Sequence, residues 1–115
     1  MNDYEYPTDE QLQLIKDWDY KQGFKSLIEY IESLWWMPDW GFKLYKGRGH
    51  FPKSRVFKLQ LHTGGWSGNE SIINNLQQNS FWRLCFYKEI VGGHYWFEIK
   101  RECWVRDRSN EPRRN

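Results

Sequence analysis

Apolar residues in the first third of the chain recur at the three- and four-residue spacing of helices. Thr8 and Gln11 have the spacing of a capping box, so the first helix is expected to start at Thr8. Its buried side would hold Leu12, Ile15 and Trp18. A second helix is predicted to end near Trp36, because Pro38 prevents its continuation. Its apolar side is formed by Phe24, Leu27, Ile28, Ile31, Leu34 and Trp35.

From Gly41 onward apolar positions alternate with polar ones, which is typical of strands. We predict four strands, with one further helix between the second and the third. The strands start at Gly41, Arg55, Trp82 and His94, and the helix covers residues 69–78. Gly92 and Gly93 stand between the last two alternating segments, which indicates a hairpin.

The predicted order of elements is therefore ααββαββ. Short hairpin connections favour antiparallel pairing, and helices with one apolar side should cover one face of the sheet. The chain is expected to be an α+β protein with two layers: an antiparallel sheet of about four strands and helices on one face. Residues 1–105 would form this single domain, and residues 106–115 a charged, flexible tail.

The alternation also predicts which side chains share each face of the sheet. The face under the helices would hold Phe57, Leu59, Leu61, Trp82, Leu84, Phe86, Tyr95, Phe97 and Ile99. The opposite face would hold Lys58, Gln60, His62, Arg83, Cys85, Tyr87, His94, Trp96 and Glu98. Its imidazoles, cations and rings suit a polar, negatively charged ligand. An ordinary solvated sheet face, with cross-strand pairs such as Arg83 with Glu98, is the alternative.

A glycine-rich stretch follows the second predicted strand and leads into the third predicted helix, over residues 62–71. Free N–H groups at the start of that helix could bind an anion, but Ser67 and Glu70 also have the spacing of a capping box. Trp66, between glycines, either plugs the edge of the core or presents its ring to a ligand. The candidate ligand-binding residues are His62, Gly64, Gly65, Trp66, Ser67, Gly68, Arg83, His94, Trp96 and Glu98. Gly64, Gly65, Ser67 and Gly68 would shape the rim of the pocket, Trp66 and Trp96 would stack on the ligand, and Arg83, His62 and His94 would supply donors.

Composition narrows the functional classes. Aromatic residues make up 19% of the 115 residues and include eight tryptophans, so some rings should lie on the surface or line a cleft. The net charge of +2, from 17 basic and 15 acidic residues, makes nucleic acid an unlikely partner. Nucleic-acid binding through a basic loop remains a third interpretation. The loop holds Lys43, Lys46, Arg48, Lys53 and Arg55.

The sequence gives little support for a metal site, a disulfide framework or catalysis. His50, His62 and His94 have no local metal-ligand spacing, and Cys85 and Cys103 make no disulfide framework, so no metal or other cofactor is expected. His62 with His94 as an acid–base pair for phosphoester cleavage is the less favoured, enzymatic alternative. The polar N-terminus is unlike a signal peptide and no apolar segment is long enough to cross a bilayer, so we expect a cytoplasmic protein without membrane contact.

The stretch Thr63–Glu70, the hairpin segment Gly92–Glu98 and the segment Trp35–Trp40 together resemble a group of small tailed-bacteriophage proteins of unknown function. The resemblance covers most of residues 7–100, and the tail after Arg101 has no recognised counterpart. It implies an intracellular phage origin, where small accessory proteins commonly modulate host machinery or defence. It assigns no catalytic or binding residue.

These observations predict a non-enzymatic protein that binds a small anionic or nucleotide-like ligand, with sequestration of a host defence signal as a natural use. The alternative is a protein that blocks a host enzyme or defence complex through an aromatic surface around Trp35, Trp36 and Trp40. A homodimer that pairs the open sheet faces would bury the same residues without a ligand.

Overall fold

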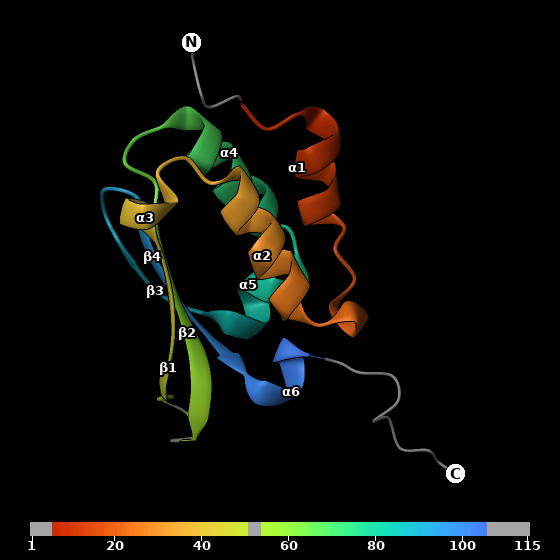
Figure 1. Cartoon of the computed structure of the whole chain (residues 1–115), viewed down its shortest axis with the longest axis vertical. Helices are drawn as coiled ribbons and strands as arrows, with labels where there is room; N and C mark the ends of the chain where they lie inside the picture. Colours follow the sequence, from red (N-terminus) through yellow and green to blue (C-terminus); the bar gives the residue numbers. More distant parts are fainter. Residues whose placement is uncertain (1–5, 51–53, 106–115) are drawn as a thin grey trace.

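The alternating segments form a sheet of four antiparallel strands, which helices cover on one face (Figure 1). The computed structural model describes residues 6–50 and 54–105, so the predicted tail at 106–115 lies outside the described residues. The elements are α1 (Asp9–Lys16), a 3₁₀ turn (Tyr20–Gln22), α2 (Phe24–Leu34), α3 (Pro38–Gly41), β1 (Phe42–Arg48), β2 (Arg55–His62), α4 (Ser67–Leu76), α5 (Ser80–Cys85), β3 (Phe86–Ile90), β4 (His94–Lys100) and α6 (Arg101–Trp104). The predicted α+β class is confirmed.

The strands lie in the order β1-β2-β4-β3, so β2 and β4 form the centre of the sheet. Every pairing is antiparallel, and Leu59 of β2 lies opposite both Leu44 of β1 and Phe97 of β4. The chain leaves β2 through α4 and α5, forms the edge strand β3 and returns as β4 through the predicted hairpin turn. His62, the last residue of β2, therefore lies opposite His94, the first residue of β4.

The first two helices form for the predicted reasons. Thr8 Oγ1 accepts a hydrogen bond from the Gln11 amide (3.1 Å), and Gln11 Oε1 accepts one from the Thr8 amide (2.8 Å), which completes the capping box. The apolar side of α2 is buried, at Phe24, Leu27, Ile28 and Ile31. α2 ends at Leu34, and Pro38 then occupies the first turn of the short helix α3.

The sheet has the predicted two faces. Side chains from its two central strands are fully buried under the helices, at Leu59, Leu61, Phe97 and Ile99, and Phe57, Phe86 and Tyr95 pack against them. The opposite face of the two central strands carries Lys58, Gln60, His62, His94, Trp96 and Glu98. We call this second surface the open face.

One predicted strand is largely wrong, because residues 82–85 belong to helix α5 and only Phe86 and Tyr87 of that segment lie in β3. Phe81 and Cys85, one helical turn apart, are both buried, so a helix serves the core better than a strand here. As a consequence Arg83 and Cys85 do not lie on the open face. Arg83 and Leu84 are instead exposed on α5.

Asn79 holds α5 against the end of α1. Its Oδ1 accepts a hydrogen bond from the Phe81 amide (2.8 Å) and so caps α5. Its Nδ2 lies 3.0, 3.2 and 3.0 Å from the carbonyl oxygens of Ile15, Lys16 and Trp18. A buried side chain thus satisfies both a helix start and carbonyls at the end of a distant helix.

Replacing Asn79 with Ala should lower the free energy of unfolding by about 2–3 kcal/mol, because buried carbonyls and an amide lose their partner. Urea denaturation measures this change. Asn74→Ala, at an exposed position of α4, is the matched control and should change the free energy by less than about 0.5 kcal/mol. Equal effects of the two substitutions would show that the Asn79 amide does not hold α5 against the end of α1.

Candidate functional site

Two glycine turns meet at the end of the sheet where β2 stops and β4 starts. The Thr63 amide donates a hydrogen bond to the Gly93 carbonyl (2.9 Å), and Thr63 is fully buried. Gly93 has a φ of 88°, and a Cβ at this position would lie 2.1 Å from Thr63 Oγ1. Gly64 and Gly65 also have positive φ angles, of 64° and 75°. The glycines of this corner are therefore required by the backbone, whatever else they do.

The start of α4 differs from the prediction. The N-cap residue is Trp66, without a side-chain cap, so the predicted capping box of Ser67 and Glu70 is wrong. The Ser67 hydroxyl pairs with the Tyr6 hydroxyl instead, and the Glu70 carboxylate accepts a hydrogen bond from the Thr63 hydroxyl (3.5 Å). The sequence has the right residue types, but the helix starts one residue earlier than the capping box requires.

Trp66 covers the start of α4. Its ring stacks on Trp36, with centroids 5.6 Å apart, and lies so close to Gly68 that a Cβ there would be 2.2 Å from it. Gly68 and Asn69 are both buried. Of the two alternatives for Trp66, the packing favours a plug at the edge of the core, since the ring packs on Trp36.

Asn69 fixes this corner in the same way as Asn79 fixes α5, and sequence reasoning missed both. Asn69 Oδ1 accepts a hydrogen bond from the Trp36 amide (2.9 Å), and its Nδ2 donates to the carbonyls of Trp36 (3.2 Å) and Thr63 (3.3 Å). The link holds the segment after α2 against the start of α4. The position of Trp36, and hence of the rings that follow it, depends on this amide.

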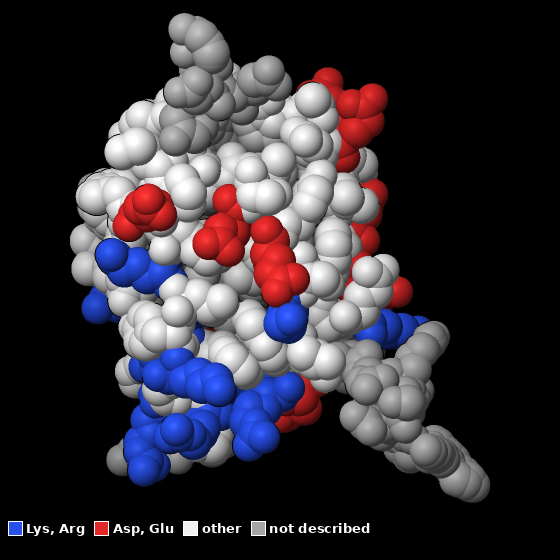
Figure 2. Space-filling model, viewed as in Figure 1, with Lys and Arg blue, Asp and Glu red and all other residues white. Residues whose placement is uncertain are grey.

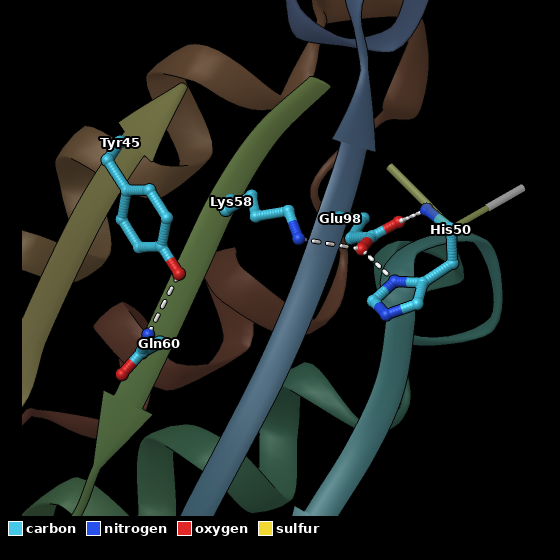
Figure 3. A network of polar contacts seen from close by, with 5 residues as sticks. All are labelled: Tyr45, His50, Lys58, Gln60 and Glu98. Carbon is cyan, nitrogen blue, oxygen red and sulfur yellow. Dashed lines mark hydrogen bonds and ion pairs between the residues drawn. The ribbon is translucent and has the colours of Figure 1, made fainter. Parts of the chain in front are cut away.

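His62 and His94 form a directed chain of hydrogen bonds across the open face. Gln60 Nε2 donates to Tyr45 Oη (2.9 Å; Figure 3), which turns Gln60 Oε1 toward His62 Nε2 at 3.1 Å. His62 Nε2 must then carry a hydrogen, so His62 Nδ1 accepts from His94 Nδ1 at 2.7 Å. The structure thus brings together two histidines that the alternation placed on one face, and the chain of hydrogen bonds favours a neutral His62.

The pKa of His62 is lowered accordingly. Burial disfavours its charged form, and the charges of His94 and Lys43 add to this effect. A proton added to His62 Nδ1 would also face the hydrogen that His94 donates. His62 therefore stays neutral at pH values where an exposed histidine would start to gain a proton.

A second network lies further along the open face, around Glu98 (Figure 3). Its carboxylate lies 3.2 Å from Lys58 Nζ and pairs with the amide and the imidazole of His50. Burial raises the pKa of Glu98, but these hydrogen bonds outweigh burial, so the net pKa lies below its ordinary value. Glu98 therefore has a cross-strand cation, as the solvated-face alternative predicted, but the cation is Lys58 and not Arg83.

Trp96 lies between two lysines on the open face. Lys88 Nζ is 4.6 Å from the centroid of its ring, and His62 meets the ring edge-on at 5.6 Å. On the other side Gln60 separates Trp96 from Lys43 of β1 in the sheet register. An anion with an aromatic group fits this arrangement chemically, and the surface that would receive it is a sheet face.

Beside the histidines lies an apolar hollow of about 290 Å³, lined by Trp36, Met37, Trp40 and Gly64. We call these four residues the indole patch. Trp40 and Met37 are 48% and 43% exposed, and the ring centroids of Trp40 and His62 are 6.1 Å apart. The indole patch therefore continues directly into the row His62, His94 and Ile90 of the open face.

The ten predicted site residues thus fall into separate places. His62, His94, Trp96 and Glu98 share the open face. Gly64 belongs to the indole patch, whereas Gly65, Trp66, Ser67 and Gly68 build the corner before and at the start of α4. Arg83 lies on helix α5 and not on the open face. The important surface residue missing from the prediction of the ligand site was Trp40, and the density of tryptophans around it was the available signal.

The chain matches no protein-family model, no curated protein and no solved structure. Within residues 6–50 and 54–105, no helix combines the length and the apolar character needed to cross a membrane. Nor do three or more His, Cys, Asp or Glu side chains of this part of the chain come together as a metal site requires. Cys85 is buried, and burial raises the pKa of its thiol, as expected for an inert core cysteine.

Gly93→Ala should be much more destabilising than Gly65→Ala. Both positions have positive φ, which costs an alanine about 1 kcal/mol, but only at Gly93 would the new methyl group also displace a buried threonine. At Gly65 nothing lies within 4 Å of the position that the methyl group would take. Thermal or urea unfolding of the two variants measures the difference, and equal losses would contradict the Thr63–Gly93 contact.

His94→Gln should raise the pKa of His62, because the neighbouring positive charge disappears while the ring stays buried. The pKa should rise only part of the way to the ordinary value of about 6.5, since burial is the larger cause. An NMR titration of the imidazole protons measures it. His50→Gln, on the Glu98 network, is the control and should leave the His62 pKa unchanged. A His62 pKa that is the same in the wild type and in both variants would contradict the proposed chain of hydrogen bonds.

Proposed function

We propose that this protein is a non-enzymatic binding protein that recognises another protein through the indole patch and the adjoining row of the open face. The observation that carries the proposal is the exposure of Trp40 and Met37 around a hollow that Gly64 leaves free of a side chain. Exposed aromatic and methionine side chains in a small hollow are typical of the central contacts of protein interfaces.

The surroundings of the hollow define the partner further. Lys43 and Lys88 flank the row of rings that continues from Trp40 through His62 to Trp96, and both are exposed. A matching surface would therefore offer an apolar side chain to the hollow and carboxylates to the two lysines. If the chain is a phage protein, as its resemblance implies, such a partner would be a host enzyme or a defence complex in the bacterial cytoplasm.

A small anionic or nucleotide-like ligand is the second candidate. It is favoured by Lys88 over the ring of Trp96, with Lys43 nearby. It ranks behind a protein partner for two reasons. Small-molecule sites are usually concave, whereas Trp96 lies on a sheet face, and the start of α4 is covered by the ring of Trp66.

The test compares Trp40→Ala with Leu14→Ala, a similarly exposed apolar residue on α1. Immobilised wild-type protein would capture a partner from bacterial lysate; mass spectrometry would identify it, and calorimetry with the purified partner would measure affinity. Trp40→Ala should weaken binding about thirtyfold, as expected for a central aromatic contact worth about 2 kcal/mol. Leu14→Ala should leave it unchanged.

Several results would contradict a separate protein partner. Unchanged affinity after Trp40→Ala would exclude the indole patch. Heat on titration with nucleotides or cyclic dinucleotides that Trp96→Ala abolishes and Trp40→Ala does not would establish the second candidate instead. A dimer in light scattering that Trp40→Ala converts to a monomer would make a second copy of this chain the occupant.

A further inference from the structure

The charges of this protein are separated in space although they almost cancel in sum. In Figure 2, Lys and Arg gather over the lower end of the molecule, where the end of β1, the start of β2 and helix α6 lie in Figure 1, while Asp and Glu lie mostly elsewhere. We call Lys46, Arg55, Lys100 and Arg101 the basic end. Because a net charge says nothing about distribution, the near balance in the sequence does not exclude a polyanionic partner.

The basic end is built by the sheet register. Arg55 starts β2, and Val56 pairs with Lys100 at the end of β4, so Arg55 and Arg101 come next to each other. Across the other side of β2, Arg55 lies opposite Arg48 of β1. Like charges on neighbouring strands are unfavourable. The register nevertheless gathers Arg55 and Arg101 at one end of the sheet.

None of the four cations is neutralised by an ion pair within the part of the chain that the structure describes. The ion pairs found there are Lys25–Glu29, His50–Glu98 and Lys58–Glu98. Lys46 Nζ instead lies 5.8 Å from the centroid of the Phe57 ring. One carboxylate, that of Glu102, contributes to the lining.

The basic end is also hollowed. One hollow of about 280 Å³ is lined by Lys46, Arg55, Val56, Phe57 and Arg101. A neighbouring hollow shares Arg55 and Arg101 and adds Ser54, Lys100 and Glu102. The two arginines therefore stand between two adjoining depressions, as they would along a groove for an extended chain of negative groups. Guanidinium groups bind phosphate oxygens with two parallel hydrogen bonds, which suits this position.

An aromatic ring lines the same groove. Phe57 is half-buried and stacks on Trp104 of α6, with ring centroids 4.1 Å apart and planes 16° apart. Cations that follow a backbone, together with rings that contact bases, are the common elements of surfaces that bind single-stranded nucleic acid. We infer that the basic end binds single-stranded nucleic acid, with Arg55 and Arg101 on its phosphates.

The basic end is separate from the indole patch and lies at the opposite end of β2, so nucleic-acid binding there does not depend on the proposed protein partner. The basic end contains only part of the basic loop predicted from the sequence. Lys46, Arg48 and Arg55 lie at this end, Lys43 lies toward the other end of β1, and Lys53 lies outside the described residues. Lys100 and Arg101 join the surface from a segment more than 40 residues after Arg55 in the sequence.

The test measures fluorescence anisotropy of a labelled 20-nucleotide thymidine oligomer with the whole protein over a series of salt concentrations. Four phosphate contacts predict a slope of about −2.8 in log K against log salt, at about −0.7 per contact with a single strand. Arg55→Gln with Arg101→Gln should weaken binding at least tenfold at low salt and reduce the slope by about 1.4. Lys21→Gln with Lys25→Gln removes the same net charge from exposed positions in the 3₁₀ turn and at the start of α2, and should change neither value.

Equal weakening by the two double variants would overturn the inference, because the effect would then follow from net charge alone. Unchanged binding after loss of both arginines would overturn it as well. So would equal binding of inorganic phosphate or of a duplex of the same length, since neither uses a groove for a single strand. Circular dichroism of each variant confirms that the fold is intact, and Trp40→Ala, which removes the proposed protein contact, should bind the oligomer like the wild type.

Discussion

Buried backbone groups at helix ends need hydrogen-bond partners, and in this protein two asparagine side chains supply them over long distances in sequence. Asn79 joins the end of α1 to the start of α5, and Asn69 joins the segment after α2 to the start of α4. The helical layer is thereby tied together at points where apolar packing alone would leave polar atoms unpaired. The placement of Trp36 and Trp40, and so of the proposed binding surface, rests on the second of these links.

The fold could be predicted from the sequence to the extent that its patterns are local. The capping box at Thr8, the apolar side of α2 and the alternation in β2 and β4 each involve residues within one element, and the structure confirms them. The segment 82–85 was misassigned because an alternation over so few residues does not distinguish a strand from one helical turn. The error carried Arg83 onto a face where it does not lie.

The site was predictable in part for the same reason. Parity placed His62, His94, Trp96 and Glu98 on one face, and the register brings the two histidines into contact. The asparagine links span 33 and up to 64 residues, and no local pattern reveals them. The glycines of the stretch at residues 62–71 have structural causes: Gly64 and Gly65 have positive φ angles, and the ring of Trp66 lies against Gly68.

Strand β2 has a consequence for how this protein would act in an assembly. It runs from Arg55 to His62, about 23 Å at the usual rise per residue, and its two ends carry surfaces of opposite character, one cationic and one aromatic. A rigid central strand paired on both sides does not let these ends approach or shield each other. Two molecules bound at the two ends would therefore stay at a fixed distance from each other. Binding at one end would leave the other end sterically accessible.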